Sequence, residues 1–347
     1  MIKFEFAKKK NKNKIQKFID LNFKKNHILA KSNKFFNWLY VDKKINCIVA
    51  LENNIIIGIY LFVPLNHYDK KINKNHIFFS TWTVKGFKKS KSVNKNKQGV
   101  AIAYRMLNKV YNIFKSKLII SVGIDHRLVK FHNYKNFKTY TSNHHFLISP
   151  YVKKFKILKS VNILQDPFNK KEFIFENIDS QVKIKKISIN HLFQHQIPQK
   201  SKNYIINRYM KHPIYKYYIY TISSKEKIFS LFVFRVVKAK GAKVIRLIDY
   251  FGSNKLFVNA KTFFYEILKI YKAEYLDFYS FGIPLNILNK SGLKNRNNYK
   301  NLIIADYFEP FVNKNINVPV GIMKSNFKGN VRIFKGDGDQ DRPHFIK

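Results

Sequence analysis

Hydrophobic residues near the N-terminus recur three and four positions apart, which is the spacing of one face of a helix. The pattern runs over residues 15–23 and again over 35–39, with polar residues between. It predicts two amphipathic helices. Two β-rich runs follow at 47–51 and 55–63, joined by Asn53 and Asn54, which accept left-handed turn geometry. These runs predict a β-hairpin.

Beyond the hairpin, the pattern alternates between strand and helix. An apolar run at 77–84 predicts a third strand, and a lysine-rich loop leads from it to residue 98. From Gly99 to Phe114 the apolar residues return to helical spacing, and the run at 118–124 predicts a strand directly after that helix. This stretch therefore predicts the order strand, helix, strand.

The second half of the chain repeats the order of the first. We expect strands at 215–222, 228–237 and 244–251, a helix at 258–272 and a strand at 275–281. Two copies of strand, strand, strand, helix, strand predict a duplicated α/β module. Because no Gly/Ser-rich linker separates the copies, we expect a first domain over 1–152, a structured crossover over 153–180 and a second domain over 181–347.

The composition agrees with two globular domains and adds a large positive charge. The 347 residues are 46% hydrophobic, and 66 basic against 20 acidic residues give a net charge of +46. Nucleic acid is one partner that would explain this charge. However, eight of the basic residues are arginine and 58 are lysine, spread from end to end, whereas a binding groove would gather basic and aromatic residues. We favour drift toward A- and T-rich codons, and nucleic-acid binding stays the alternative.

The cysteine count and the apolar runs limit the class of protein further. The chain has one cysteine, Cys47, which excludes an internal disulfide and a thiolate metal cluster. The longest apolar runs are about ten residues, well short of the ~20 that a membrane-spanning helix needs. No apolar run of signal-peptide length follows the basic N-terminus. We therefore expect a cytoplasmic protein with no membrane span and no metal.

The residues between the third strand and its helix form a motif with chemical meaning. In Asn96-Lys97-Gln98-Gly99-Val100-Ala101, the glycine lets backbone amides approach a diphosphate at a helix N-terminus. The motif resembles the pyrophosphate loop of the GCN5-related N-acetyltransferase (GNAT) superfamily, which reads Gln/Arg, two residues, Gly, one residue, Gly/Ala. Gly99 and Ala101 match, and Asn96 departs from the pattern. The resemblance implies acetyl-CoA as co-substrate and, as coenzyme-binding residues, Val84, Gln98, Gly99, Val100 and Ala101.

A second motif of that superfamily is matched after the next strand. Residues 125–137 fit the thirteen-residue frame Asn-Pro-x-Ala-x-x-x-Tyr-x-x-x-Gly-Phe, with Phe137 at the terminal aromatic position. His132 falls where the family's tyrosine acts as general acid toward the coenzyme thiolate. Tyr134 lies two residues on, roughly 200° around a helix, so the two side chains cannot face one sulfur. The resemblance implies that His132, or Tyr134 if the register is shifted, protonates the thiolate.

Taken together, the motifs imply an α/β (α+β) fold of two tandem GNAT-like modules, each a mixed β-sheet flanked by helices. The first module would hold acyl-CoA and the second would contribute the substrate surface. The chain looks similar to tandem acyltransferase-like proteins of bacterial surface-polysaccharide synthesis, which implies acetyl transfer to an amine, such as an amino sugar or nucleotide sugar. The general base stays open among Glu52, His67, Asp69 and water, as do the acyl chain and the oligomeric state.

Two alternatives stay open, one within the transferases and one in a different functional class. A Fem-type transferase also has tandem modules, and its use of aminoacyl-tRNA would explain the charge of +46. A basic RNA-binding protein without catalysis is the other alternative.

Three arginines and two aspartates of the second half are candidate substrate residues. Arginine is rare in this chain, and a site for a carboxylate or phosphate requires its planar two-pronged donor. The arginine candidates are Arg208, Arg235 and Arg246, and the alternative is structural pairing with Asp249, Glu274 or Asp277. Near the C-terminus Asp337 and Asp339 would bind a substrate ammonium or fold back onto the basic surface, and the alternative is a solvated tail. The adjacent His144 and His145 would face opposite sides of a strand, which makes a shared metal improbable.

Overall fold

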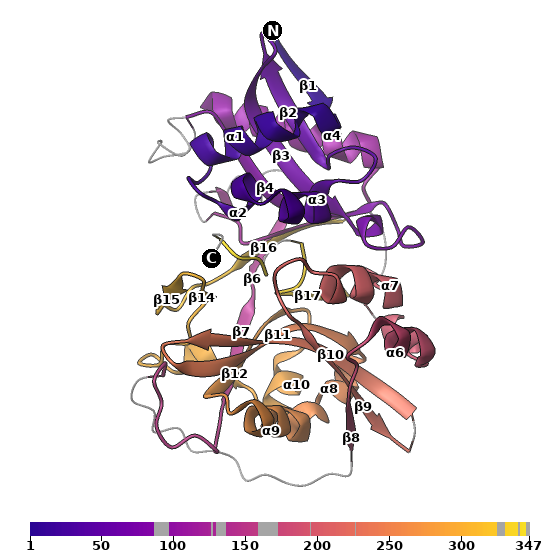
Figure 1. The fold of residues 1–347 in the computed structure, drawn as a ribbon, viewed down its shortest axis with the longest axis vertical. Helices are drawn as coiled ribbons and strands as arrows, with labels where there is room; N and C mark the ends of the chain where they lie inside the picture. The colour runs from indigo at the N-terminus through magenta and orange to yellow at the C-terminus, as the bar shows by residue number, and fades with distance from the viewer. Residues whose placement is uncertain are drawn as a thin grey trace. The chain divides into compact units, whose positions relative to one another are not determined.

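The computed structural model describes residues 1–86, 97–125, 128–129, 137–158, 173–194, 196–225, 227–324, 330–338 and 341–344. The chain forms two compact units, each made of separate stretches (Figure 1). Unit 1 comprises Met1–Tyr140, Val318–Lys328 and Gly338–Lys347, and unit 2 comprises Thr141–Asn317 and Gly329–Asp337. Each unit has its own sheet and its own hydrophobic core.

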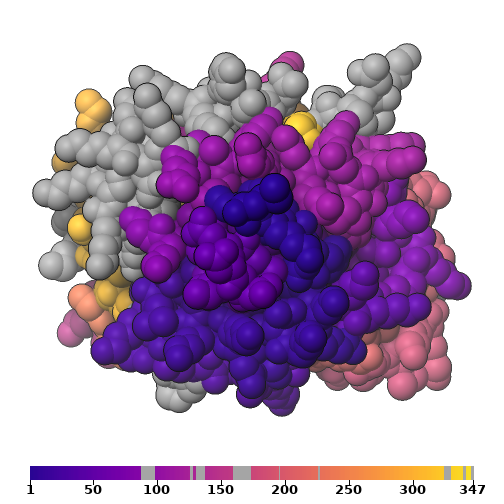
Figure 2. Space-filling view, turned by 90° about the horizontal axis from the view of Figure 1, so that it is seen from above, coloured from indigo at the N-terminus to yellow at the C-terminus, as the bar shows by residue number. Residues whose placement is uncertain are grey.

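Unit 1 is built on a seven-stranded mixed sheet. Its strands are β1 (Ile2–Phe6), β2 (Cys47–Glu52), β3 (Ile55–Pro64), β4 (His76–Val84), β5 (Leu118–Val122), β6 (Lys138–Thr141) and β16 (Pro319–Lys324). Its helices are η1 (Lys9–Asn11), α1 (Lys12–Asn22), α2 (Ile28–Lys31), α3 (Asn33–Tyr40), η2 (Leu65–His67) and α4 (Lys97–Phe114). The strand order is β1-β2-β3-β4-β5-β16-β6. Figure 2 shows residues of the first half of this unit in indigo to purple.

Helices cover both faces of this sheet. On one face α4 packs through Ile102 and Met106, and it comes so close that a Cβ at Gly58 of β3 would lie 3.3 Å from both side chains. Val84 of β4 belongs to the same hydrophobic cluster. Its neighbour Thr83 must point to the other face, where its hydroxyl donates to the carbonyl of Asn22 at the end of α1.

Unit 2 is built on an eight-stranded sheet. Its strands are β7 (Asn143–Ile148), β8 (Ile174–Asn177), β9 (Tyr218–Ser224), β10 (Lys227–Ala239), β11 (Ala242–Gly252), β12 (Tyr275–Phe281), β13 (Lys294–Asn295) and β17 (Ile333–Phe334). A separate pair is β14 (Tyr307–Phe308) with β15 (Phe311–Val312). The helices are α6 (Gln181–Lys186), η6 (Asn190–Phe193), α7 (Lys202–Ile205), the π-helical turn η7 (Ile206–Met210), α8 (Asn254–Phe257), α9 (Ala260–Tyr271), α10 (Leu285–Lys290) and η8 (Arg296–Asn298).

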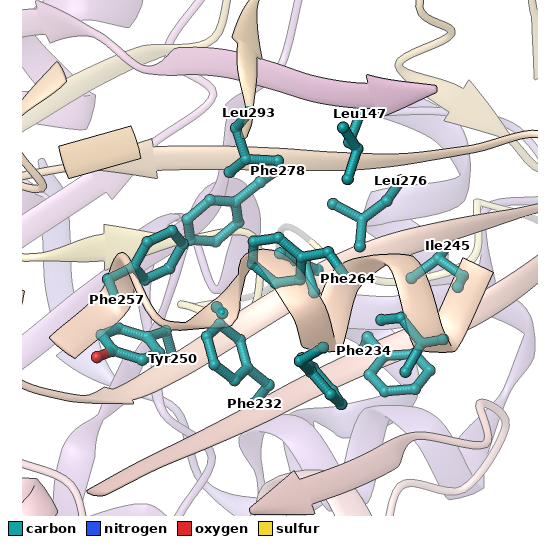
Figure 3. Packing of buried hydrophobic residues seen from close by; sticks show 14 of the residues in the cluster. Leu147, Phe232, Phe234, Ile245, Tyr250, Phe257, Phe264, Leu276, Phe278 and Leu293 are labelled. Carbon is teal, nitrogen blue, oxygen red and sulfur yellow. The ribbon is translucent and has the colours of Figure 1, made fainter. Parts of the chain in front are cut away.

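The core of unit 2 is rich in aromatic rings. Helix α9 lays Phe263 and Phe264 against Phe232 of β10, and Phe257 of α8 stacks on Phe278 of β12 with ring centroids 5.7 Å apart (Figure 3). Fully burying one such ring contributes about 1.5–3 kcal/mol. This cluster therefore holds α8 and α9 on the sheet.

The strands of the two sheets are arranged in the same order. Each sheet also contains one exchanged strand, which comes from the part of the chain that otherwise builds the other sheet. In unit 2 the order is β13-β7-β12-β11-β10-β9-β8, so β8 to β12 correspond to β1 to β5 of unit 1. The next place beside β5 is taken by β16, from the C-terminal part of the chain, and the equivalent place beside β12 is taken by β7, which directly follows β6. Each sheet contains a parallel pair, β4 with β5 in unit 1 and β11 with β12 in unit 2.

These elements confirm two tandem modules, each a mixed sheet flanked by helices. The predicted hairpin is β2 and β3, and Asn53 and Asn54 both have positive φ, at 48° and 63°. Helix α4 begins at Lys97, two residues earlier than expected, and β5 ends at Val122, because Gly123 turns the chain with a φ of 72°. In the described residues no helix is both long enough and apolar enough to cross a membrane.

Candidate functional site

The parallel strands β4 and β5 of unit 1 part halfway along β4. They pair from His76 with Leu118 to Phe79 with Ser121. Directly after this point the register of β4 against β3 shifts, since Phe62 pairs with Phe79 whereas Tyr60 pairs with Trp82. Such a β-bulge bends a strand. Among the described residues, the parallel register of β4 with β5 ends at Phe79 with Ser121.

Side chains from two other segments hold the bulge. Ser80 bonds to the hydroxyl of Tyr40, at the end of α3. Thr81 accepts a hydrogen bond of 3.1 Å from the guanidinium of Arg342, in the C-terminal segment of unit 1. Arg342 did not stand out in the sequence as a site residue, since nothing in its surroundings indicates that the chain returns to β4.

Helix α4 follows the parted strand in the chain and begins at Lys97. Gln98 and Ala101 are exposed, Gly99 is buried and Val100 is half-buried. The first N–H groups of a helix have no partner within it, and together with the helix dipole they favour an anion. Val84 is part of the hydrophobic cluster of unit 1, and Val100 packs against that same cluster.

The predicted general acids His132 and Tyr134 lie outside the described residues, as does Asp339. The residues that flank this segment are described. Ile124, Leu128 and Phe137 are all buried in the cluster that underlies α4. Phe137, the aromatic residue that ends the second motif, has its ring centroid 6.5 Å from that of Phe79 of β4.

Two of the three side chains considered as general base make hydrogen bonds to backbone groups of the protein. Glu52 is exposed at the end of β2. The ring of His67 contacts the carbonyl of Trp38 at 2.8 Å, and burial lowers its pKa, so it is neutral at neutral pH. Asp69 is nearly buried and accepts the backbone amide of Lys71 at 3.0 Å.

In unit 2, Arg246 makes the pairing with Asp277 that the sequence left open as the alternative. Its guanidinium donates to the two carboxylate oxygens of Asp277 at 3.1 and 2.6 Å. The imidazole of His144 lies 2.9 Å from the same carboxylate and stacks on Tyr279 at 3.8 Å. Burial alone would raise the pKa of Asp277, but Arg246 and His144 together lower it. Asp277 is therefore a buried, charged anchor between β7, β11 and β12.

Arg208 and Arg235 lie in a different cluster, around His212. Burial and the charges of both arginines lower the pKa of His212 to about 2, so this imidazole is neutral. Arg235 lies over the ring of Tyr215 at 3.5 Å, and Arg208 donates to the carbonyl of Gly336 at 3.2 Å. All three arginine candidates are thus buried, and two of them converge.

Asp337 is fully buried and is not part of a solvated tail. The ammonium group it binds belongs to the chain itself, because Lys200 lies 2.8 Å from Asp337 and 2.7 Å from Asp249. Tyr209 donates to Asp249 at 2.5 Å. Burial raises the pKa of Asp337 above its ordinary value.

Sequence reasoning missed the lysines of these clusters. Lys200 is one of 58 lysines and carries no signal in its neighbours. Lys335, which binds Asp306 at 3.0 Å, does lie beside the Gly336-Asp337 motif that stood out. In the part of the chain that is described, no group of three or more His, Cys, Asp or Glu residues is arranged to hold a metal ion.

No protein-family model matches the sequence, and no curated protein matches it. Solved structures do match. A GCN5-related N-acetyltransferase from Anabaena variabilis aligns with a TM-score of 0.55 and 10% identity, over 93% of this chain and 72% of its own. A probable N-acyltransferase from Enterococcus faecalis aligns with a TM-score of 0.56 and 9% identity, over the same shares of the two chains. At such identities the likeness shows the fold alone, which is GNAT-like in two tandem modules.

Proposed function

We propose that this protein is an acyl-CoA-dependent N-acyltransferase whose coenzyme binds in unit 1. The observation that carries the proposal is the parting of β4 and β5 at the bulge, followed in the chain by the N-terminus of α4. Beyond the last parallel pair, Phe79 with Ser121, β4 lies where an extended amide-containing chain such as pantetheine would pair with it. The N–H groups of the first turn of α4, which includes Gln98 and Gly99, suit a diphosphate. The names of the two solved neighbours agree with this activity.

The chemistry would be attack of an amine on the thioester carbonyl, which forms an amide and releases the coenzyme as a thiolate. His132 would return a proton to the sulfur, and Tyr134 would do so if the register is shifted. We further propose acetyl as the acyl group and an amino sugar, free or nucleotide-linked, as the acceptor. Arg208 and Arg235, which converge on His212, are the residues of unit 2 that we propose for an anionic part of the acceptor.

Thermal unfolding with acetyl-CoA tests coenzyme binding. A ligand of the native state raises the melting temperature with its concentration. Gly99→Glu should abolish the rise, because a side chain and a negative charge would take the place of the diphosphate. Asn108→Glu, at an exposed position later in α4, adds the same charge and should keep the rise. No rise for the unmodified protein at millimolar acetyl-CoA would refute the proposal.

Turnover tests the general acid. His132→Ala should lower turnover by about 10²- to 10⁴-fold and leave coenzyme binding nearly unchanged, and Tyr134→Phe should do little. The reverse result would show that the register is shifted by two and that Tyr134 is the acid. Amino sugars and nucleotide-linked amino sugars are the acceptors to compare in this assay.

A further inference from the structure

Unit 2 repeats the parting of strands that defines the proposed coenzyme site of unit 1. Strands β11 and β12 pair in parallel up to Leu247 with Phe278. Directly afterwards β11 has a bulge, because Val233 of β10 pairs with Asp249 and Phe234 pairs with Leu247, which leaves Ile248 as the extra residue. The last parallel pair and the bulge come in the same order in β4.

In unit 2 a segment of the chain itself fills this gap. Residues 333–334 form β17, which pairs with β12 at Ser280 and Phe281, just beyond the last parallel pair. Two residues later, the amide of Gly336 donates to the carbonyl of Ile248, the bulge residue of β11, at 2.8 Å. The segment 333–337 therefore bonds to both parted strands and bridges them. A pantetheine chain would need the same backbone groups.

Side chains hold this segment tightly. Phe334 stacks on Phe278 with ring centroids 5.5 Å apart, and Asp337 binds the buried Lys200. A Cβ at Gly336 would overlap the hydroxyl of Tyr209 and lie 2.9 Å from the side chain of Ile248. The segment is thus packed against buried side chains of both parted strands, Phe278 of β12 and Ile248 of β11.

The position equivalent to the N-terminus of α4 is also taken in unit 2. Helix α8, which follows β11, has only four residues. The guanidinium of Arg332 lies at its start and donates to the carbonyl of Gly252 at 2.7 Å and to the side chain of Asn254 at 3.2 Å. The backbone amide of Arg332 donates to Ile197 at 2.8 Å, which fixes this residue.

We propose that the segment 332–337 is an internal ligand of unit 2, which occupies the place of a coenzyme in that module. Unit 2 then takes no acyl-CoA, and the chain binds one molecule, in unit 1. The expected number of one bound acyl-CoA molecule rests on the proposed function. The closure of unit 2, by which we mean that the segment fills the gap between β11 and β12, rests on the contacts of the segment alone.

Amide hydrogen exchange of the unmodified protein tests the closure without any coenzyme. The amides of Arg332, Phe334 and Gly336 should exchange as slowly as those of β11, with protection on the order of 10³ or higher, because they open only when unit 2 unfolds. The turn at Asn53 and Asn54 is the internal control and should exchange fast. Exchange of the segment at the rate of that turn would overturn the proposal.

Native mass spectrometry with acetyl-CoA tests the number of coenzyme molecules that each chain binds. We expect one bound molecule per chain and none for Gly99→Glu. Two molecules on the unmodified protein, with one left on Gly99→Glu, would overturn the closure of unit 2 and leave the site in unit 1. One molecule that Gly99→Glu retains would overturn both proposals. If the unmodified protein binds none, the proposed function fails, and hydrogen exchange still decides on the segment.

Discussion

The ammonium group of Lys200 lies 2.8 Å from the carboxylate of Asp337, and both side chains are fully buried. The same ammonium group lies 2.7 Å from Asp249 of β11. One lysine thus joins three stretches of unit 2 that are far apart in the sequence. Because a buried charge is tolerated only when it is paired, each of these residues depends on the others.

Lys200→Met should therefore destabilise the protein strongly. It removes the shared cation and leaves two buried carboxylates next to each other, a change that costs about 3–5 kcal/mol of unfolding free energy. Urea unfolding measures the loss. The control is Lys183→Met, which breaks an exposed ion pair with Glu176 and should change stability little. Equal effects of the two substitutions would contradict the buried cluster.

Stability should fall on mild acidification because of buried histidines such as His145. Burial lowers the pKa of His145 to about 4, and neither ring nitrogen has a hydrogen-bond partner among the described residues. Between pH 6.5 and 4 the unfolded chain binds a proton at this imidazole that the folded protein does not, so stability falls as the pH falls. At about 1.4 kcal/mol per pKa unit, the loss at pH 5 is about 2 kcal/mol.

His145→Leu tests this contribution. The variant should lose less unfolding free energy than the unmodified protein between pH 7.5 and pH 5, as measured by urea unfolding at both values. His144 also has its pKa lowered by burial, so part of the acid sensitivity should persist in the variant. An unchanged pH dependence would show that His145 titrates near its ordinary pKa in the folded protein.

The carboxylate of Glu274 binds backbone amide groups, whereas the sequence analysis considered it as a structural partner of an arginine. This carboxylate, buried directly before β12, accepts the amides of Lys156, Ile157 and Leu158. Glu274→Gln places an NH₂ group against those amides and should cost about 1–3 kcal/mol in thermal or urea unfolding. Glu52→Gln, at an exposed position, is the control and should be close to neutral. A neutral Glu274→Gln would show that water can replace the carboxylate.

Local pattern was enough to predict the order strand, strand, strand, helix, strand that repeats in the two modules. The hairpin of β2 and β3 follows from alternation and from two asparagines with positive φ, and α9 and β12 follow from clear periodicity. The exchanged strands could not be predicted, since β7 and β16 are ordinary short runs whose partners are set by the whole fold. Strand pairing over such sequence distances leaves no local signal.

The residues of the candidate site also fall into those that the local sequence indicated and those that it did not. Gly99 and Val84 stood out because a glycine between a strand and a helix has a local meaning. The rarity of arginine singled out Arg246, but not whether its guanidinium faces a substrate or Asp277. Lys200 was hidden among many lysines, and only the fold shows that its side chain is buried between two carboxylates. Burial of a charge is a tertiary property that composition does not record.

The contact between Gly336 and Tyr209 gives a prediction about coupling. A methyl group at position 336 would overlap the Tyr209 hydroxyl, which is itself held by its 2.5 Å bond to Asp249. Gly336→Ala should therefore cost about 1–3 kcal/mol through overpacking. Tyr209→Phe should cost about 1.5–3 kcal/mol, since it removes a hydrogen bond to a buried carboxylate.

In the double variant the methyl group gains the space that the hydroxyl leaves. Its cost in urea unfolding should then be smaller than the sum of the single costs by about 1 kcal/mol, which is the coupling expected for residues in contact. Gly336→Ala with Lys3→Met is the additive control, because Lys3 is exposed and belongs to unit 1, whereas Gly336 and Tyr209 both belong to unit 2. Strict additivity in the Gly336 and Tyr209 pair would mean that the segment 333–337 does not pack against η7 as the structure places it.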